Sequence, residues 1–199
     1  MRPSQGLRPD VSAERAAFAD AIGAVATARL VFVDESGVWP GMRSGYGYAR
    51  RGRPCVEHAP YRKGRRLSLI GWVAPGAGAV VGVEGSVDRA TFERFVVEHL
   101  APCLEVGDVV VWDNHSIHKG AGARAAVEAR GARLLAQPRY SPECNAVELL
   151  WSKLKRLVRG AGADTAGGLH EAVRAACGAV REQDMTGWVE HVQRLTPQA

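Results

Sequence analysis

Two runs of strongly apolar residues each end at an aspartate, and these runs constrain the fold more than any other feature of the chain. In "LVFVDES" four apolar residues lead into Asp34, and in "VVVWDNHSIHKG" another four lead into Asp113. Short valine-rich runs are typical of buried strands in a sheet that carries helices on its faces. Turn chemistry alone can explain the Asp-Asn pair after the second run. In such sheets, however, the carboxyl ends of strands are also preferred places for catalytic and binding groups.

The order of the remaining elements predicts a mixed α/β sheet with helices packed on it. Strands come first and strand–helix alternation follows, which is the order expected for this class. The predicted elements between and around the two apolar strands are a helix over 12–24 capped by Ser12, hairpin arms over 37–52 and 65–75, a strand over 78–85, a helix over 86–104 capped near Ser86, a helix over 117–130, a strand over 132–137, a helix from Ser141 and helical structure over 167–195.

Basic residues are concentrated between positions 43 and 66, and the net charge of the chain is +5. This segment contains one acid, Glu57, and three tyrosines (Tyr46, Tyr48 and Tyr61) interleaved with the cations. Such a patch is the electrostatic footprint expected for a nucleic-acid backbone. A solvated hairpin whose arginines only confer solubility is an equally good interpretation of this pattern. The basic residues are Arg43, Arg50, Arg51, Arg53, Arg62, Lys63, Arg65 and Arg66.

Composition argues against a membrane or secreted protein. No apolar run approaches the roughly 18 residues of a membrane span, and the first ten residues lack the apolar core of a signal peptide. The four cysteines are 48, 41 and 33 positions apart and form no CxxC pair. This spacing predicts reduced thiols in a cytoplasmic protein, in place of a zinc site or a disulfide framework.

The segment "YSPECNAVELLWSKLKRLVRG" predicts an amphipathic helix with an acid beside its apolar stripe. Ser141 suits the N-cap and Pro142 the first helical position. Apolar residues recur at helical spacing over 147–158, and Glu148 borders this stripe. From the pattern alone, an ordinary amphipathic helix is the favoured interpretation. Glu143, near the predicted start, is expected to complement the helix dipole.

Three blocks of the sequence together resemble the signature blocks of DDE transposases, in particular the bacterial insertion-sequence branch of the Tc/mariner superfamily. The blocks are "FVDESG", "WDNHSIHKG" and "PRYSPECNAVELLWSKLK"; they follow the family's order, and 34 residues separate Asp113 from Glu148. The resemblance implies a ribonuclease H-like fold in which Asp34, Asp113 and Glu148 form a catalytic, metal-binding triad. It also implies two Mg²⁺ ions, for which Mn²⁺ substitutes, since paired cations activate the nucleophile and stabilise the leaving oxyanion.

The same resemblance implies an enzyme, the catalytic domain of a transposase that cleaves and transfers DNA strands at transposon ends. Its expected partners are double-stranded DNA, a second copy of the chain on that DNA and, because the family's helix-turn-helix module is missing here, a separate polypeptide bearing that module. The expected parts are a linker remnant with a short helix over 1–25, the catalytic domain over 26–165 and its C-terminal helical part over 166–199. A non-catalytic DNA-binding or multimerising remnant and a stand-alone nuclease on the same fold remain alternatives.

Direct DNA contacts are expected from basic residues and from one histidine. His118 and Lys119 either contact DNA or settle the turn after Asp113, and a two-histidine, one-carboxylate metal site with His115 is a competing interpretation. Glu35 points to the opposite face of the sheet if its strand continues. The predicted DNA-binding residues are Arg50, Arg51, Arg53, Arg62, Lys63, Arg65, Arg66, His118, Lys119, Lys153 and Lys155.

Three positions depart from the family's pattern. Arg139 and Ala146 stand where the family has proline, and Cys144 stands where leucine is common. None belongs to the triad, but together they keep the interpretation as a remnant open.

Overall fold

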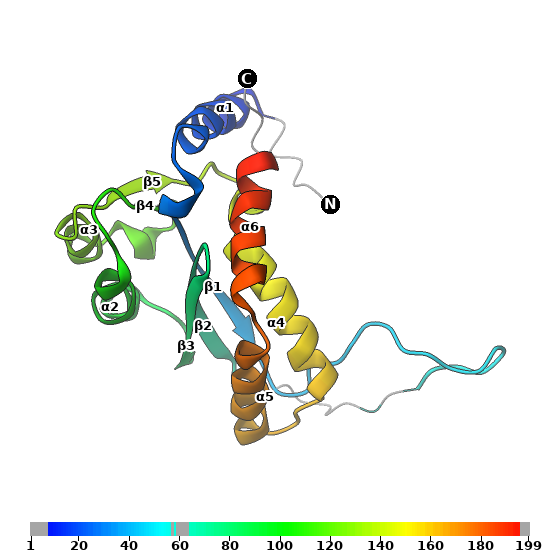
Figure 1. The fold of residues 1–199 in the computed structure, drawn as a ribbon. Coiled ribbons are helices and arrows are strands. Elements are labelled where there is room, and N and C mark those ends of the chain that lie inside the picture. Colours follow the sequence, from blue (N-terminus) through cyan, green and yellow to red (C-terminus); the bar gives the residue numbers. More distant parts are fainter. Residues whose placement is uncertain (1–7, 57, 59–63, 196–199) are drawn as a thin grey trace.

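The computed structural model describes residues 8–56, 58 and 64–195, which form one five-stranded sheet with helices on both faces (Figure 1). The strands are β1 (Leu30–Val38), β2 (Leu67–Ala74), β3 (Ala77–Glu84), β4 (Val109–Trp112) and β5 (Arg133–Ala136). The α-helices are α1 (Pro9–Gly23), α2 (Arg89–Phe95), α3 (Ala121–Glu128), α4 (Val147–Ala161), α5 (Ala166–Gly178) and α6 (Glu182–Leu195). Short helical turns of other types lie at η2 (Thr27–Arg29), η3 (Val96–Leu100), η4 (Ala101–Cys103), η5 (Ser116–Lys119) and η6 (Pro142–Cys144).

The sheet is mixed, as predicted, with the strand order β3-β2-β1-β4-β5. β1, β2 and β3 are antiparallel neighbours, whereas β4 and β5 run parallel to β1. Pro75 and Gly76 connect β2 to β3, and Gly76 has a φ of 75°. A proline followed by a glycine with positive φ suits a tight type II turn, so the sequence specifies this hairpin locally.

The prediction of a hairpin arm over 37–52 is wrong. β2 pairs with β1 itself, which continues beyond Asp34 to Val38 in the register Val38↔Leu67. The segment from Ser44 to Gly52 is rich in glycine and lacks the alternation of apolar residues that would bury one side of a strand. Met42 still packs in the apolar core, and only from Ser44 onward does the chain run away from the body of the protein (the cyan segment of Figure 1), where the side chains of Tyr46 and Tyr48 are fully exposed.

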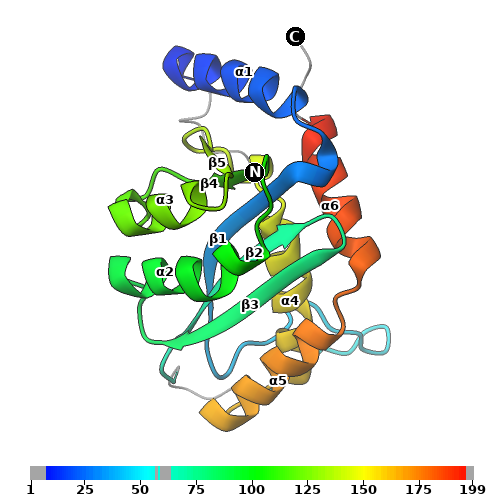
Figure 2. The ribbon, with the colours of Figure 1, turned by 60° about the vertical axis from the view of Figure 1, so that its left-hand side comes forward.

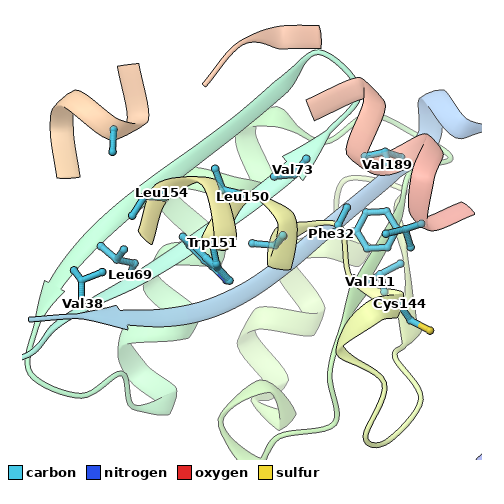
Figure 3. Close-up of a cluster of buried hydrophobic side chains, with 14 of the residues drawn as sticks. Phe32, Val38, Leu69, Val73, Val111, Cys144, Leu150, Trp151, Leu154 and Val189 are labelled. Carbon is cyan, nitrogen blue, oxygen red and sulfur yellow. The ribbon is translucent and has the colours of Figure 1, made fainter. Parts of the chain in front are cut away.

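Two apolar clusters lie on opposite faces of the sheet, because alternate residues of a strand point to opposite sides. Phe32 and Leu69 belong to the cluster under α4, α5 and α6, and Val33 and Ile70 belong to the cluster under α2 and α3. Figures 1 and 2 show these helices as layers on either side of the sheet. Figure 3 shows Trp151 and its neighbours on α4 lying against β1 and β2. The central strands are therefore covered on both faces.

Four predicted helix starts differ from the structure, and one of them is α3, which begins at Ala121 after the turn η5 and not at 117. α1 begins at Pro9, where proline fits the first turn, and Ser12 lies inside the helix. α2 is capped by Asp88, two residues after Ser86, and the Asp88 carboxylate accepts a hydrogen bond from the Thr91 N–H. A carboxylate is a strong N-cap acceptor, which explains this choice.

The start of α4 has the largest consequence. Ser141 and Pro142 open only the short turn η6, and α4 begins at Val147. The Asn145 side chain accepts a hydrogen bond from the Val147 N–H at 3.1 Å and so takes the capping role predicted for Ser141. Glu143 therefore lies outside α4 and does not complement its dipole.

Two further expectations concern thiols and membranes. Cys55, Cys103, Cys144 and Cys177 all carry free thiols. Among the described residues, no helix combines the length and the apolar character needed to cross a membrane.

Candidate active site

The sheet places the two predicted aspartates beside each other. β1 and β4 run parallel in a register that pairs Phe32 with Val111. Asp34 follows Phe32 by two residues, and Asp113 follows Val111 by two residues. The prediction that the first strand ends at Asp34 is wrong, because β1 continues along β2 to Val38. β4 does end, at Trp112. The departure of the chain after β4 leaves open space beside Asp34.

Glu148 reaches the same space from the first turn of α4. Asp34, Asp113 and Glu148 line one cavity of about 510 Å³, although they come from three different elements. One wall of this cavity is the chain segment that follows β5. The other residues around it are Asn114, His115, Lys119, Gln137, Pro138, Arg139, Tyr140, Ser141, Pro142 and Asn145.

Asp34 is partly buried, and its pKa is raised to about 7. Burial is the main cause, because it removes solvation from the charged carboxylate, and repulsion by Glu148 adds to it. The indole N–H of Trp151 donates a hydrogen bond to Asp34 at 3.2 Å. Gly71, which faces Asp34 across the β1–β2 ladder, makes room for this indole, since a Cβ there would lie 2.8 Å from the Trp151 ring.

Asp113 has the opposite electrostatic environment. Burial disfavours its charged form, but hydrogen bonds from His118 and from the backbone N–H of His115 outweigh burial, so its pKa is lowered. The His118 Nδ1 lies 2.6 Å from Asp113 Oδ1, and the His115 N–H donates to the same oxygen at 2.8 Å. The carboxylate is therefore held ionised and in a fixed orientation.

His118 connects Asp113 to Glu35 through the interior. Its Nε2 lies 2.7 Å from Glu35 Oε1, and the ring of Phe92 packs over it with a centroid separation of 4.2 Å. Burial alone would lower the pKa of His118, but the two carboxylates outweigh burial and raise the pKa from 6.5 to about 10. The imidazolium therefore carries a proton on each nitrogen at neutral pH.

This geometry decides between the predictions made for these residues. His118 is buried with both nitrogens engaged, so it presents no surface to DNA, and of its two expected roles the one that settles the turn matches the structure. The engaged nitrogens also exclude it from a two-histidine metal site with His115. Glu35 points away from the cavity, as its place in a continuing strand predicts.

Asn145 and Gln137 fix the start of α4 relative to the sheet. The Asn145 side-chain amide donates to the Val33 carbonyl and to Gln137 Oε1, at 3.1 Å each, while its oxygen caps Val147. Glu148 follows in the first turn, so these contacts set its position. Its pKa is raised by burial, which the positive charge of Lys155 partly offsets.

Glu143, the other acid near the start of α4, does not line the cavity. It forms an ion pair with Arg15 of α1. It belongs to the turn η6, whereas Glu148 belongs to α4, so the two acids lie on different elements.

The three carboxylates are not gathered as tightly as a loaded metal site requires. Among the described residues, no three His, Cys, Asp or Glu side chains are grouped closely enough to hold a metal ion. Like charges around an open cavity repel one another, which favours this separation. The donor set still fits a hard cation, because oxygen ligands are those that Mg²⁺ prefers. A cation would also relieve the unfavourable ionisation of Asp34 and Glu148.

The predicted DNA-binding residues fall into several settings. Lys119 is exposed at the cavity, whereas Lys153 on α4 forms an ion pair with Asp184 of α6. Arg66 donates to the Ser36 carbonyl at 3.3 Å. Lys155 is close enough to affect the pKa of Glu148. Those on or near the extended segment, Arg50, Arg51, Arg53 and Arg65, are exposed, and Arg62 and Lys63 lie outside the described residues.

Several residues that shape the site were not predicted from the sequence. Trp151 was recognised only as part of an apolar stripe, and nothing in its spacing predicted that its N–H meets Asp34. The requirement for Gly71 depends on that same indole and cannot be found without it. Asn145 carried a usable signal, because an asparagine two residues before an apolar periodic run is a common helix cap.

Comparisons with known proteins agree with this geometry. The family described as DDE superfamily endonuclease matches residues 29–168. A comparison with curated proteins gives no match. The Mos1 transposase paired-end complex with left transposon end superposes with a TM-score of 0.77 at 15% identity, over 96% of this chain and 61% of that chain. The catalytic domain of Mos1 mariner transposase gives a TM-score of 0.71 at 10% identity, over 96% and 92% of the two chains.

These similarities confirm the predicted ribonuclease H-like fold with its mixed sheet flanked by helices. This chain spans about three-fifths of the protein in the Mos1 paired-end complex and nearly all of the isolated Mos1 catalytic domain. Because the family match extends over more than half of its residues, the chain belongs to the DDE superfamily endonucleases.

Proposed function

We propose that this chain is the catalytic domain of a transposase, which cleaves DNA strands at transposon ends and joins them to a target. The observation that carries the proposal is the convergence of Asp34, Asp113 and Glu148 on one cavity, with the ionisation of two of them disfavoured in a way that a cation would reverse. Similar structures support it, since Mos1 transposase was crystallised with transposon ends, with Mg and with Mn.

The metal-binding residues in this proposal are Asp34, Asp113 and Glu148. Two Mg²⁺ or Mn²⁺ ions would supply Lewis-acid activation of a water or 3′-hydroxyl nucleophile and stabilisation of the departing oxygen. The protein contributes orientation. The His118 imidazolium holds Asp113 ionised, the Trp151 indole fixes one oxygen of Asp34, and Asn145 sets the position of Glu148.

DNA is held mainly through its phosphates in this proposal. Lys119 lies at the cavity and Lys155 lies near Glu148, so both can neutralise phosphates close to the reacting bond. The exposed arginines Arg50, Arg51 and Arg53 can contact the backbone farther away. Phosphate contacts provide affinity but little sequence information. In this proposal, recognition of transposon ends depends on a helix-turn-helix module outside these residues, and two copies of the catalytic domain assemble on the DNA.

The residues that depart from the family's pattern do not favour a non-catalytic remnant. Cys144 and Ala146 are buried in the cluster under α4, where they fill space beside the start of that helix. Neither replaces a carboxylate, and Arg139 has its own partners on α1. A plasmid-nicking experiment can distinguish a transposase domain from a non-catalytic remnant and from a stand-alone nuclease.

Nicking of supercoiled plasmid with Mg²⁺ or Mn²⁺ tests the proposal. We expect metal-dependent nicking by the wild type and none by D34N, D113N or E148Q, with all four proteins folded by circular dichroism. E190Q, which alters a half-exposed acid on α6, is the matched control and should nick normally. A wild type that binds DNA without nicking would identify a remnant. Nicking without strand joining, even with transposon ends and a helix-turn-helix partner supplied, would identify a nuclease.

A further inference from the structure

One wall of the cavity is a chain segment held in place by helix α1. We define the wall segment as residues 137–142, all six of which line the cavity. It follows β5 and leads into the turn η6 before α4. Any contact that fixes this segment therefore also fixes the shape of the cavity.

The backbone of the wall segment is held in an unfavourable conformation. Tyr140 has a φ of 54°, and it is the only residue other than glycine with a positive φ among those that the structure describes. A bulky side chain disfavours this left-handed region, so it persists only where surrounding contacts impose it. The tyrosine side chain is half exposed at the cavity. The contacts on either side of Tyr140 must therefore supply the constraint.

Arg139, immediately before Tyr140, is bound by two acids of α1. Its guanidinium lies 2.8 Å from Asp10 and 2.6 Å from Glu14, and its backbone N–H also donates to Glu14 at 3.2 Å. An isolated exposed ion pair contributes little. Here one carboxylate binds both the side chain and the backbone of the same residue, so it restrains the main chain directly.

Ser141, immediately after Tyr140, is bound by the same helix. The Arg15 Nε donates to the Ser141 hydroxyl at 2.7 Å, and the Arg15 guanidinium also pairs with Glu143. The Ser141 hydroxyl in turn donates to the Arg139 carbonyl at 3.0 Å. The buried side chain of Gln137, at the start of the wall segment, donates a hydrogen bond to the Ser141 carbonyl at 2.7 Å. Tyr140 thus lies between two residues that α1 holds.

We infer that α1 is part of the catalytic apparatus, and that Arg15, Glu14 and Arg139 are positioning residues that hold the wall segment and Tyr140 against the bound DNA strand. This inference rests on the proposed function. It also accounts for an arginine at position 139, because an arginine can be bound by the acids of α1 and a proline cannot. Orientation of a bound phosphate strongly affects the rate of its reaction. Loss of these contacts should therefore lower kcat and leave metal affinity unchanged.

The test compares R139E, E14Q and the charge swap E14R/R139E with the wild type. Hydrogen–deuterium exchange reports the wall directly, because the amides of Cys144 and Asn145 donate to the Ser141 and Pro142 carbonyls. We expect exchange of these amides to rise on the order of tenfold in R139E and E14Q. We expect kcat for Mn²⁺-dependent nicking to fall roughly tenfold in both, with KM and the calorimetric Mn²⁺ affinity unchanged. The swap should restore exchange and kcat together.

The control is R29E, because the Arg29 side chain is as exposed as that of Arg139 and also pairs with two acids, Glu105 and Asp108, none of which lines the cavity. It should change neither readout. If Arg139 instead contacts phosphate directly, E14Q will keep full activity and the swap will stay inactive, which overturns the inference. Unchanged exchange in R139E and E14Q also overturns it. If the wild type neither binds Mn²⁺ nor nicks DNA, the proposed function fails, and the exchange data alone decide whether α1 holds the wall.

Discussion

Replacing Asp34 by asparagine should stabilise the protein when no divalent cation is present, although it removes a residue proposed for catalysis. The pKa of Asp34 is raised from 3.8 to about 7, chiefly by burial and then by Glu148. The folded protein therefore binds a proton that the unfolded chain releases, and the free energy of unfolding falls as pH rises from about 4 to 7. Asparagine has no charge to desolvate, and its side-chain oxygen can still accept the Trp151 hydrogen bond.

The size of the effect follows from the shift. One pKa unit corresponds to about 1.4 kcal/mol, so the shift corresponds to about 4 kcal/mol above pH 7 as an upper limit. Relaxation of the side chain and access of water reduce this, and we expect D34N to gain about 1–3 kcal/mol. For a chain of this size, each kcal/mol raises Tm by about 2–4 °C. Asp113 provides the contrast, because its pKa is lowered by His118 and His115, and D113N should be destabilised.

Thermal unfolding at pH 7.5 in a chelating buffer, and again with excess Mn²⁺, measures both effects. Without cations, the Tm should follow the order D34N, wild type, D113N, from highest to lowest. A ligand at 100 times its Kd stabilises the folded state by about 2.7 kcal/mol. Saturating Mn²⁺ should therefore raise the Tm of the wild type and leave D34N nearly unchanged. A D34N Tm below that of the wild type in chelator would refute the argument that burial disfavours the charge of Asp34.

Three further predictions follow from the site. Calorimetric titration with Mn²⁺ should show weakened binding for E148Q and near-normal binding for E143Q, because Glu143 is paired with Arg15 outside the cavity; the reverse result would mean that the third ligand is wrongly assigned. The His118 pKa of about 10 lies above its unfolded value of 6.5, so its contribution to stability is complete below about pH 6.5 and is lost as pH rises through 10. In urea unfolding across that pH range, the free energy of unfolding should decline less for H118Q than for the wild type. An identical decline would argue against a charged His118 between Glu35 and Asp113. In competition gel shifts the chain alone should bind duplex DNA with a steep salt dependence and almost no preference for transposon ends, whereas salt-resistant, end-selective binding would place the recognition surface within these residues.

The fold could be predicted wherever the sequence determined structure locally. The valine-rich runs before Asp34 and Asp113 are buried strands, and the Pro75–Gly76 pair makes a tight turn through its own backbone preferences. The apolar stripe of α4 has the predicted helical spacing over 147–158. These features depend on periodicity and turn chemistry, which neighbouring residues specify.

Features that depend on distant contacts could not be predicted. β1 continues past Asp34 because β2, more than thirty residues away in the sequence, pairs with it in the observed register. α4 starts at Val147 because Asn145 is held by the Val33 carbonyl on β1. His118 is buried because Glu35 and Asp113 meet its two nitrogens. In each case the determining partner is unknown until the sheet is assembled.

The most direct test of the proposed active site is a crystal structure of the protein with Mn²⁺, using the anomalous scattering of manganese to locate the ions. We predict anomalous peaks in the cavity, bound by carboxylate oxygens of Asp34, Asp113 and Glu148, with those three side chains drawn closer together than in the metal-free protein. Peaks elsewhere on the surface, or a cavity without manganese at concentrations that saturate nicking, would contradict the assignment of these three residues.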